Sequence, residues 1–141
     1  MILLDTNVVS EPLKLNPDLG VLTWLDAQTI ETLYLSAIGL AELRFGIAAL
    51  PSGKRRDMLH TSLEQRILPL FIGRILPFDT TASESYAVLR ARARAHGMAI
   101  APADGYIAAT AMTHGLIVAT RDTGPFEAAG LTVINPWNTQ H

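Results

Sequence analysis

The chain has no cysteine among its 141 residues, which excludes disulfide bonds and thiolate metal sites. None of its apolar runs approaches the ~18 residues that are needed to cross a membrane. The N-terminal apolar run is interrupted at Asp5 and is not preceded by a basic stretch, so we expect no signal peptide. These absences favour a cytoplasmic protein.

Excess positive charge is also missing, because 13 acidic residues outnumber 11 basic ones and the net charge is −2. A protein that binds nucleic acid by charge alone is usually basic, so binding here would need local basic patches and a bridging metal ion. Charged residues make up 17% of the chain and hydrophobic residues 49%, which argues against disorder. At this length we expect a single domain over residues 1–141.

A glycine-rich phosphate loop is absent too, which disfavours an enzyme that acts on nucleoside triphosphates. None of the histidines forms a catalytic pair with a nucleophile that the sequence pattern would indicate. His96 and His114 each precede a glycine at a predicted helix end, where the helix dipole favours a histidine. The acidic residues are therefore the stronger candidates for chemistry.

Apolar runs of strand length alternate along the chain with longer segments of helical period. Strands are predicted over residues 1–4, 33–35, 75–76, 116–119 and 131–134. Helices are predicted over residues 7–13, 17–27, 37–50, 54–68, 81–96 and 102–114, with a break or kink at Pro69. This alternation predicts an α/β domain with a mostly parallel sheet.

Four acidic residues stand where this fold would bring them to one edge of the sheet: Asp5, Glu42, Asp104 and Asp122. Asp5 ends the first predicted strand. A helix from Asp104 to residue 114 is about 16 Å long, and the following strand returns about the same distance to Asp122. Glu42 lies in the second turn of its helix and leans toward the same edge. Carboxylates at one edge repel each other unless a cation joins them, and Mg²⁺ or Mn²⁺ with a phosphate-ester substrate suits such a site.

Each acid also has an ordinary explanation. Asp5 fits a helix N-cap, Asp104 a first-turn acid and Asp122 an Asx-turn, whereas Glu42 fits a solvated helix position. Their convergence favours a shared site, because separate caps would not require it. Three polar neighbours are candidates to orient the carboxylates or metal-bound water: Asn7, Ser36 and Thr120. The first two of these equally fit cap positions.

Seven of the 11 basic residues fall into three groups: Arg44 beside Glu42, residues 54–56, and the set Arg90, Arg92 and Arg94. Arg90 and Arg94 share one face of their predicted helix. A solvated face is the more common explanation for the last two groups, and binding along a phosphate backbone is the alternative. The two tryptophans are expected to pack rather than to stack on bases.

Four segments together carry a family resemblance: residues 3–7 (LLDTN), 35–43, 103–111 and 119–122. In this order and spacing they resemble the four motifs of PIN domains. More closely, the chain resembles the VapC toxins, and among them the FitB-like branch, over nearly its whole length. The family's acids correspond here to Asp5, Glu42, Asp104 and Asp122.

The resemblance implies a three-layer α/β/α sandwich, a homodimer, and cleavage of RNA that depends on Mg²⁺ or Mn²⁺. It also implies a cognate antitoxin of the VapB or FitA kind, whose tail blocks the acidic site. The ribbon-helix-helix part of that antitoxin would bind operator DNA. An alternative within the family is a binding subunit of a DNA-bound toxin–antitoxin repressor with little nuclease activity.

The expected mechanism is hydrolysis. Asp5, Glu42 and Asp104 hold one divalent ion, and Asp122 helps to hold that ion or a second one. The ion lowers the pKa of a bound water, which attacks the phosphorus in line. A haloacid-dehalogenase-like phosphatase also begins with a strand that ends in Asp, but it needs a second Asp where this chain has Asn7.

Overall fold

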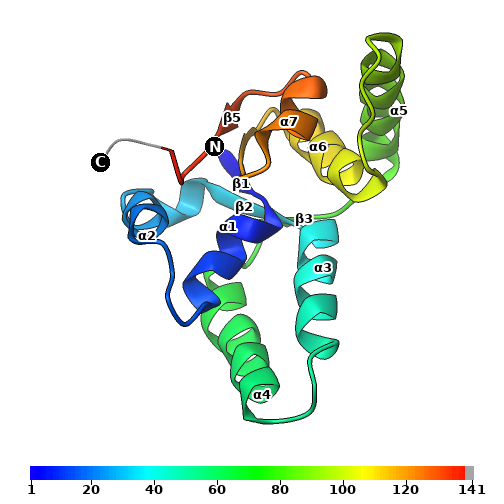
Figure 1. Ribbon diagram of the computed structural model, residues 1–141. Coiled ribbons are helices and arrows are strands. Elements are labelled where there is room, and N and C mark those ends of the chain that lie inside the picture. The colour runs from blue at the N-terminus through cyan, green and yellow to red at the C-terminus, as the bar shows by residue number, and fades with distance from the viewer. Residues whose placement is uncertain (139–141) are drawn as a thin grey trace.

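The computed structural model describes residues 1–138 and places five strands in one sheet (Figure 1). The strand order is β3-β2-β1-β4-β5, and every pair of neighbouring strands is parallel. The strands are β1 (Ile2–Leu4), β2 (Leu33–Ser36), β3 (Ile75–Leu76), β4 (Ile117–Ala119) and β5 (Val133–Ile134). The prediction of a mostly parallel α/β sheet is therefore confirmed for the described part of the chain.

Helices cover both faces of the sheet and complete the predicted three layers. They are α1 (Thr6–Ser10), α2 (Leu19–Asp26), α3 (Ala37–Ala48), α4 (Lys54–Thr61), α5 (Thr80–Ala95), α6 (Pro102–His114) and α7 (Thr123–Ala128). Figure 1 shows α1, α3 and α4 on one side of the sheet and α5, α6 and α7 on the other. Within residues 1–138, no helix combines the length and apolarity that crossing a bilayer requires.

The sheet separates two hydrophobic cores because its central strands are apolar on both faces. In β1, Ile2 and Leu4 belong to the core shared with α1 and α3, whereas Leu3 belongs to the core shared with α5 and α6. Leu3 has no exposed surface, and burying such a side chain stabilises the fold by roughly 1.5–3 kcal/mol. The alternation along three residues is therefore enough to fix β1 between the two layers.

The helix boundaries are set by local chemistry. The Ser36 hydroxyl accepts a hydrogen bond from the Gly39 backbone N–H at 2.9 Å and starts α3. Pro102 lies in the first turn of α6. Backbone N–H groups in this turn have no acceptor within the helix, so the lack of an N–H in proline costs no hydrogen bond. Gly115, with φ of 65°, ends α6 in a left-handed conformation that favours glycine. The predicted bounds of this helix are confirmed.

Two segments differ most from the prediction, beyond shifts of a few residues at the ends of other elements such as α1 and β5. The helix predicted over residues 54–68 is α-helical only to Thr61, and continues as a π-helical turn (Ser62–Ile67) and a 3-10 turn (Leu68–Phe71) that contains Pro69. Helix α7 was not predicted, because its Gly-Pro pair is typical of a turn. Pro125 lies in the first turn, where no N–H is needed, and Phe126 is fully buried.

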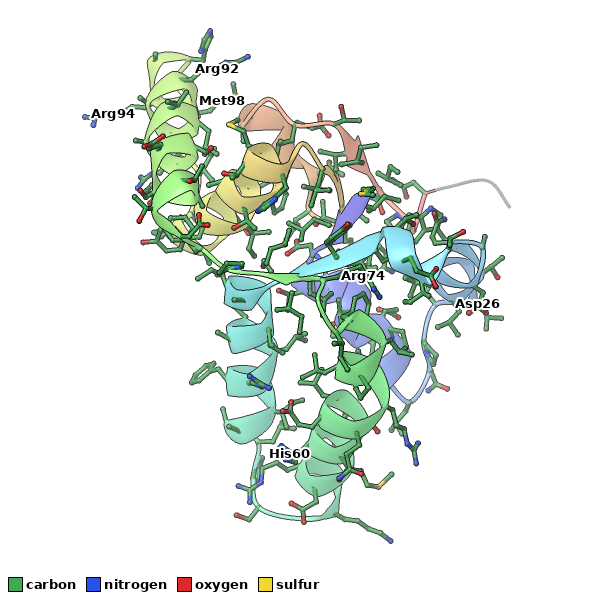
Figure 2. The ribbon with its side chains drawn as sticks, turned by 180° about the vertical axis from the view of Figure 1, so that it is seen from behind. Asp26, His60, Arg74, Arg92, Arg94 and Met98 are labelled. Atoms are coloured by element: carbon green, nitrogen blue, oxygen red, sulfur yellow. The ribbon has the colours of Figure 1, made fainter. Side chains whose placement is uncertain are left out.

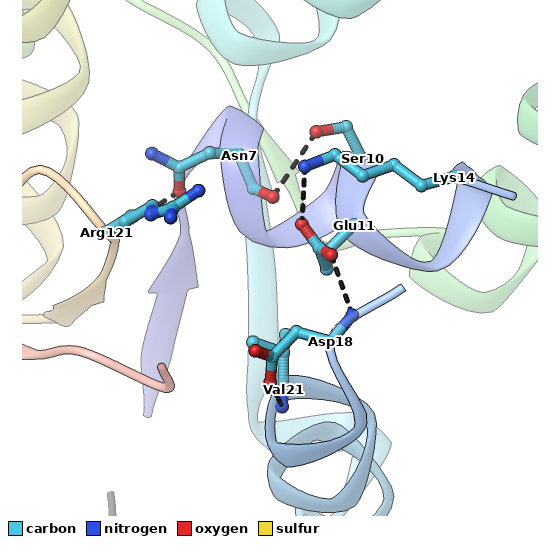
Figure 3. Close-up of polar contacts among 7 residues, drawn as sticks. All are labelled: Asn7, Ser10, Glu11, Lys14, Asp18, Val21 and Arg121. Atoms are coloured by element: carbon cyan, nitrogen blue, oxygen red, sulfur yellow. Dashed lines mark hydrogen bonds and ion pairs between the residues drawn. The ribbon is translucent and has the colours of Figure 1, made fainter. Parts of the chain in front are cut away.

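Glu11 fixes the connection from α1 to α2 (Figure 3). Its carboxylate accepts a hydrogen bond from the Asp18 backbone N–H at 2.9 Å and lies 2.9 Å from the Lys14 ammonium. The Asp18 side chain in turn accepts a hydrogen bond from the Val21 backbone N–H at 3.1 Å and caps α2. The hydrogen bond from Lys14 is the main cause that holds the pKa of Glu11 below its usual value.

Candidate functional site

The central strands β1 and β4 end side by side at the edge where the acids gather. Asp5 follows β1, and its backbone N–H donates to the Ala119 carbonyl at 2.9 Å. Thr120 follows β4, and its backbone N–H donates to the Ile134 carbonyl at 2.9 Å. Because the strands are parallel, their carboxyl ends meet at this edge, which is where open α/β sheets bind ligands.

The Asp5 carboxylate is buried and held by two hydrogen bonds. Oδ1 accepts from the Thr6 backbone N–H at 2.8 Å, and Oδ2 accepts from the Thr120 hydroxyl at 2.8 Å. Asp5 is 6% exposed and Thr120 is fully buried. The Thr120 hydroxyl also accepts from the Asp122 backbone N–H at 3.0 Å. One buried threonine therefore connects two of the four acids, while Asp5 also caps α1.

Glu42 is tied to the same edge from α3 through Thr6. The Thr6 hydroxyl donates to Glu42 Oε1 at 3.1 Å. Gly39 leaves the space for this arrangement, because a Cβ there would lie 3.0 Å from Ser36 Oγ and 3.4 Å from Thr6 Oγ1. Thr6 was not among the predicted site residues, although it directly follows Asp5 in the first motif.

Asp104 and Asp122 approach from the opposite layer, in the first turn of α6 and immediately before α7. Asp104 is partly buried and Asp122 is exposed. Burial raises the pKa of Asp104, and repulsion from Glu42 and from Asp122 raises it further. The proximity expected from the lengths of α6 and β4 is therefore present.

The pKa of Asp5 is also raised, and burial is the main cause. The hydrogen bonds from Thr120 and Thr6 oppose this shift, whereas repulsion from Asp104 and Glu42 adds to it. Asp5 thus interacts with Asp104 and Glu42, and Asp104 interacts with Glu42 and Asp122. The structure brings all four predicted acids into one connected group of repelling charges.

The acids form an open group rather than a closed cage. As the side chains stand within residues 1–138, no three carboxylates or imidazoles are close enough together to enclose a cation. Mg²⁺ keeps several of its waters when it is bound, so it does not require a closed cage, and an open set of oxygen donors suits it. The exposed side chains of Glu42 and Asp122 have room to turn toward a cation.

The other two polar candidates have backbone partners. Asn7 Oδ1 accepts from the Arg121 backbone N–H at 3.3 Å, which ties α1 to the loop that carries Asp122 (Figure 3). The Ser36 hydroxyl is used to cap α3. Ser36 therefore matches the cap explanation, whereas Asn7 holds a loop beside the acids.

Basic side chains near the acids in sequence are engaged elsewhere. Arg44, expected beside Glu42, forms an ion pair with Glu64 at 2.7 Å. The Arg121 guanidinium lies over the Trp137 ring, 5.2 Å from its centre. Within residues 1–138 the four acids form no ion pair, so their negative charge can attract a cation.

An apolar hollow of about 290 Å³ adjoins Glu42 between α1, α3 and α4. Its lining includes Thr6, Lys14, Glu42, Leu43, Ile47 and Leu59. The hollow is therefore continuous with the acid edge on the side of α3.

Known proteins share this architecture over nearly the whole chain. Residues 2–131 match the family model of the PIN domain. The chain is 64% identical over 137 residues to the VapC ribonuclease Y4jK of Sinorhizobium fredii, which covers 97% of this chain and 98% of the relative. It is 59% identical over 138 residues to Toxin FitB of Neisseria gonorrhoeae, with 98% and 99% covered.

The fold comparison agrees with the sequence comparison. A solved structure of FitAB bound to an IR36 DNA fragment superimposes with a TM-score of 0.96 at 57% identity, covering 100% of this chain and 99% of that chain. The chain belongs to the PIN domain family. Its predicted resemblance to the VapC toxins and to FitB is confirmed.

Proposed function

We propose that this chain is the toxin of a type II toxin–antitoxin system and that it hydrolyses RNA phosphodiester bonds with a divalent metal ion. The observation that carries the proposal is the connected group of carboxylates at the carboxyl edge of the parallel sheet. The relatives named VapC ribonuclease and Toxin FitB support it. With RNA as the substrate, the proposed place of action is the cytoplasm.

The proposed ligands of the ion are Asp5, Glu42 and Asp104, with Asp122 on the same ion or on a second one. When bound, Mg²⁺ or Mn²⁺ would lower the pKa of a water and offset negative charge on the phosphoryl oxygens. The donors fit such hard cations because all of them are carboxylate oxygens. Repulsion within the group is relieved by a cation, which favours its binding.

The chain's own residues prepare this site. The buried Asp5 carboxylate is held in one orientation by the Thr6 N–H and the Thr120 hydroxyl. Glu42 is kept at the edge by the Thr6 hydroxyl, which releases it at the cost of one exposed hydrogen bond. We propose that Thr120 and Thr6 position ligands, and that Asn7 keeps the loop before α7 in place.

We further propose a cognate ribbon-helix-helix antitoxin that covers the apolar hollow beside Glu42 with its tail. The hollow supports this because an apolar segment bound there ends next to the acids. The FitAB complex bound to DNA supports an assembly that reaches operator DNA through the antitoxin. A homodimer of the toxin is part of the same proposal.

The test is cleavage of a total-RNA pool by the antitoxin-free protein in Mg²⁺, Mn²⁺ or EDTA. Asp104→Asn should lower the cleavage rate by several orders of magnitude, because it removes a ligand from the reacting centre. Asp57→Asn, which changes an exposed acid on α4, serves as the matched control and should cut like the wild type. Equal cutting by Asp104→Asn, or cutting that persists in EDTA, would contradict the proposal.

A second candidate function is favoured by the FitAB structure with bound DNA. Under this second function, the chain is mainly a binding subunit of a repressor complex and cleaves little RNA. Gel-shift titration of the operator with the complex should then give the same affinity for the wild type and Asp104→Asn. Folded wild-type protein that cuts no RNA in either metal would favour this function over the hydrolase.

A further inference from the structure

A basic stripe on α5 leads away from the acid edge and has no part in the site described above. Tyr86, Arg90 and Arg94 are spaced by four residues, so they share a helix face about 12 Å long at ~1.5 Å per residue. With Met98 and Ile100 they line a hollow of about 680 Å³ between α5 and the segment that leads into α6. Figure 2 shows Arg94 near the far end of α5, projecting from the helix.

The near end of the stripe touches the residue that follows Asp104. Gly105 is buried, and a Cβ on it would lie 2.9 Å from Tyr86 Cε2 and 3.7 Å from Arg90 Cδ. The side chains of Tyr86 and Arg90 therefore lie directly on the backbone of the first turn of α6. The stripe begins one residue away from a proposed metal ligand.

The first two residues of the stripe are held in place by aromatic packing. The Tyr86 ring stacks on Tyr106, with 4.7 Å between ring centres and 26° between planes, and Phe78 meets it edge-on at 6.1 Å. The Tyr86 hydroxyl accepts a hydrogen bond from Arg90 Nη1 at 2.8 Å. Arg90 is thus oriented by a neutral partner and keeps its full positive charge for a ligand.

Arg90 and Arg94 are exposed and carry charge that no acid neutralises in the described residues. The ion pairs formed within residues 1–138 are those of Lys14 with Glu11 and of Arg44 with Glu64. Arg92 lies on another face of α5, where its guanidinium comes within 3.4 Å of the position that a Cβ of Gly130 would take. The stripe therefore contains two available guanidinium groups, and Arg92 does not belong to it.

We propose that Arg90 and Arg94 bind phosphates of the RNA strand on one side of the scissile bond, with Tyr86 as the residue that positions Arg90. This inference rests on the proposed function. The four carboxylates repel an RNA backbone and the chain carries a net charge of −2, so attraction has to come from local positive charge. Guanidinium groups match phosphate oxygens in geometry as well as in charge.

The test is equilibrium binding of a fluorescein-labelled single-stranded RNA of mixed sequence, about 12 nucleotides long, followed by anisotropy. Full-length antitoxin-free protein is used in EDTA, so that no metal-dependent cleavage interferes. The double variant Arg90→Gln/Arg94→Gln should bind about tenfold more weakly and reduce the salt slope by about 1.4, or ~0.7 per lost phosphate contact. Arg92→Gln is the matched control on the same helix and should change the affinity by less than about twofold.

Unaltered affinity in the double variant would overturn the subsite. An equal loss in Arg92→Gln would overturn it too, because only general charge would then matter. Sedimentation velocity must give the same association state for all variants, and a changed state in the double variant alone would likewise overturn it. Tyr86→Phe, which removes only the hydroxyl that holds Arg90, should give an intermediate loss of affinity.

Cleavage measured in parallel separates this inference from the proposed function. The double variant should raise KM and keep kcat, since it removes binding that ground state and transition state share. If the wild type cleaves RNA in a metal-dependent way but the double variant binds RNA with unchanged affinity, the proposed arginine subsite is wrong and the proposed hydrolase activity stands. RNA binding through the arginines without any cleavage overturns the hydrolase and leaves a phosphate-binding surface.

Discussion

Replacing Thr120 by valine removes a hydroxyl that joins Asp5 to Asp122, and the structure predicts the resulting loss of stability. The hydroxyl is fully buried, donates to Asp5 Oδ2 at 2.8 Å and accepts from the Asp122 N–H at 3.0 Å. A hydrogen bond to a charged group contributes about 1.5–3 kcal/mol. Valine has nearly the same shape, so no cavity forms, and the free energy of unfolding should fall by about 2–3 kcal/mol.

Thr120→Ser is the matched control, because it keeps the hydroxyl and loses a buried methyl group. It should cost about 1 kcal/mol. Urea unfolding at pH 7 in EDTA measures both variants, and a loss of 2 kcal/mol lowers the midpoint by about 1 M at a slope near ~2 kcal/mol/M. If Thr120→Val lowers the free energy of unfolding no more than Thr120→Ser does, the Thr120 hydroxyl does not hold the Asp5 carboxylate.

The pH dependence gives the prediction a second and independent check. The pKa of Asp5 is raised in the folded protein, which means that folding favours the protonated carboxyl. The contribution of Asp5 to the free energy of unfolding is therefore fully present at low pH and is lost as pH rises through the folded pKa. The hydrogen bond from Thr120 opposes that rise, and Thr120→Val should raise the pKa of Asp5 further. The loss of unfolding free energy caused by Thr120→Val should therefore become smaller as pH is lowered toward 3.8, which is the ordinary pKa of an Asp side chain. A cost that does not vary with pH would refute this account.

Three other outcomes are expected. Asp104→Asn should stabilise the metal-free protein at pH 7, because the raised pKa shows that its charge is unfavourable there; this advantage in urea unfolding should fade as pH drops below the raised pKa toward 3.8. Gly105→Ala should cost about 1–3 kcal/mol by overpacking against Tyr86, and it should also weaken RNA binding in the anisotropy assay. Glu11→Gln should cost about 1–2 kcal/mol at pH 7 through the loss of its charged contact with Lys14. Because the pKa of Glu11 is lowered, that cost should diminish as pH falls from 4.5 through the folded pKa, whereas a cost that does not decline as pH is lowered below 4.5 would contradict the role of Lys14.

Much of the fold was predictable because its boundaries are local. The bounds of α6 follow from Pro102 and Gly115, whose backbone properties begin and end a helix without help from the rest of the chain. Strand direction alone places Asp5 and Asp122 near the same edge of a parallel sheet. The convergence of the acids therefore needed no knowledge of side-chain packing.

The features that were missed depend on contacts between distant segments. Gly105 lies inside a helix, and its lack of a Cβ matters only because Tyr86 packs on it from α5. Arg44 stands near Glu42 in sequence, yet it pairs with Glu64 across two helices. Pairings of this kind are set by how helices dock, which a single sequence does not display.

The two cores on opposite faces of the sheet deliver different parts of the acid edge. Glu42 comes from the layer of α3, Asp104 comes from the layer of α6, and Asp5 directly follows strand β1 between them. When only one helical layer has packed on the sheet, at least one carboxylate is therefore missing from the site. During synthesis, the first hundred residues cannot carry a complete site, since α6 begins at Pro102. Under the proposed function, an unfinished or half-folded toxin would be harmless to the cell that makes it, and nuclease activity would report that folding is complete.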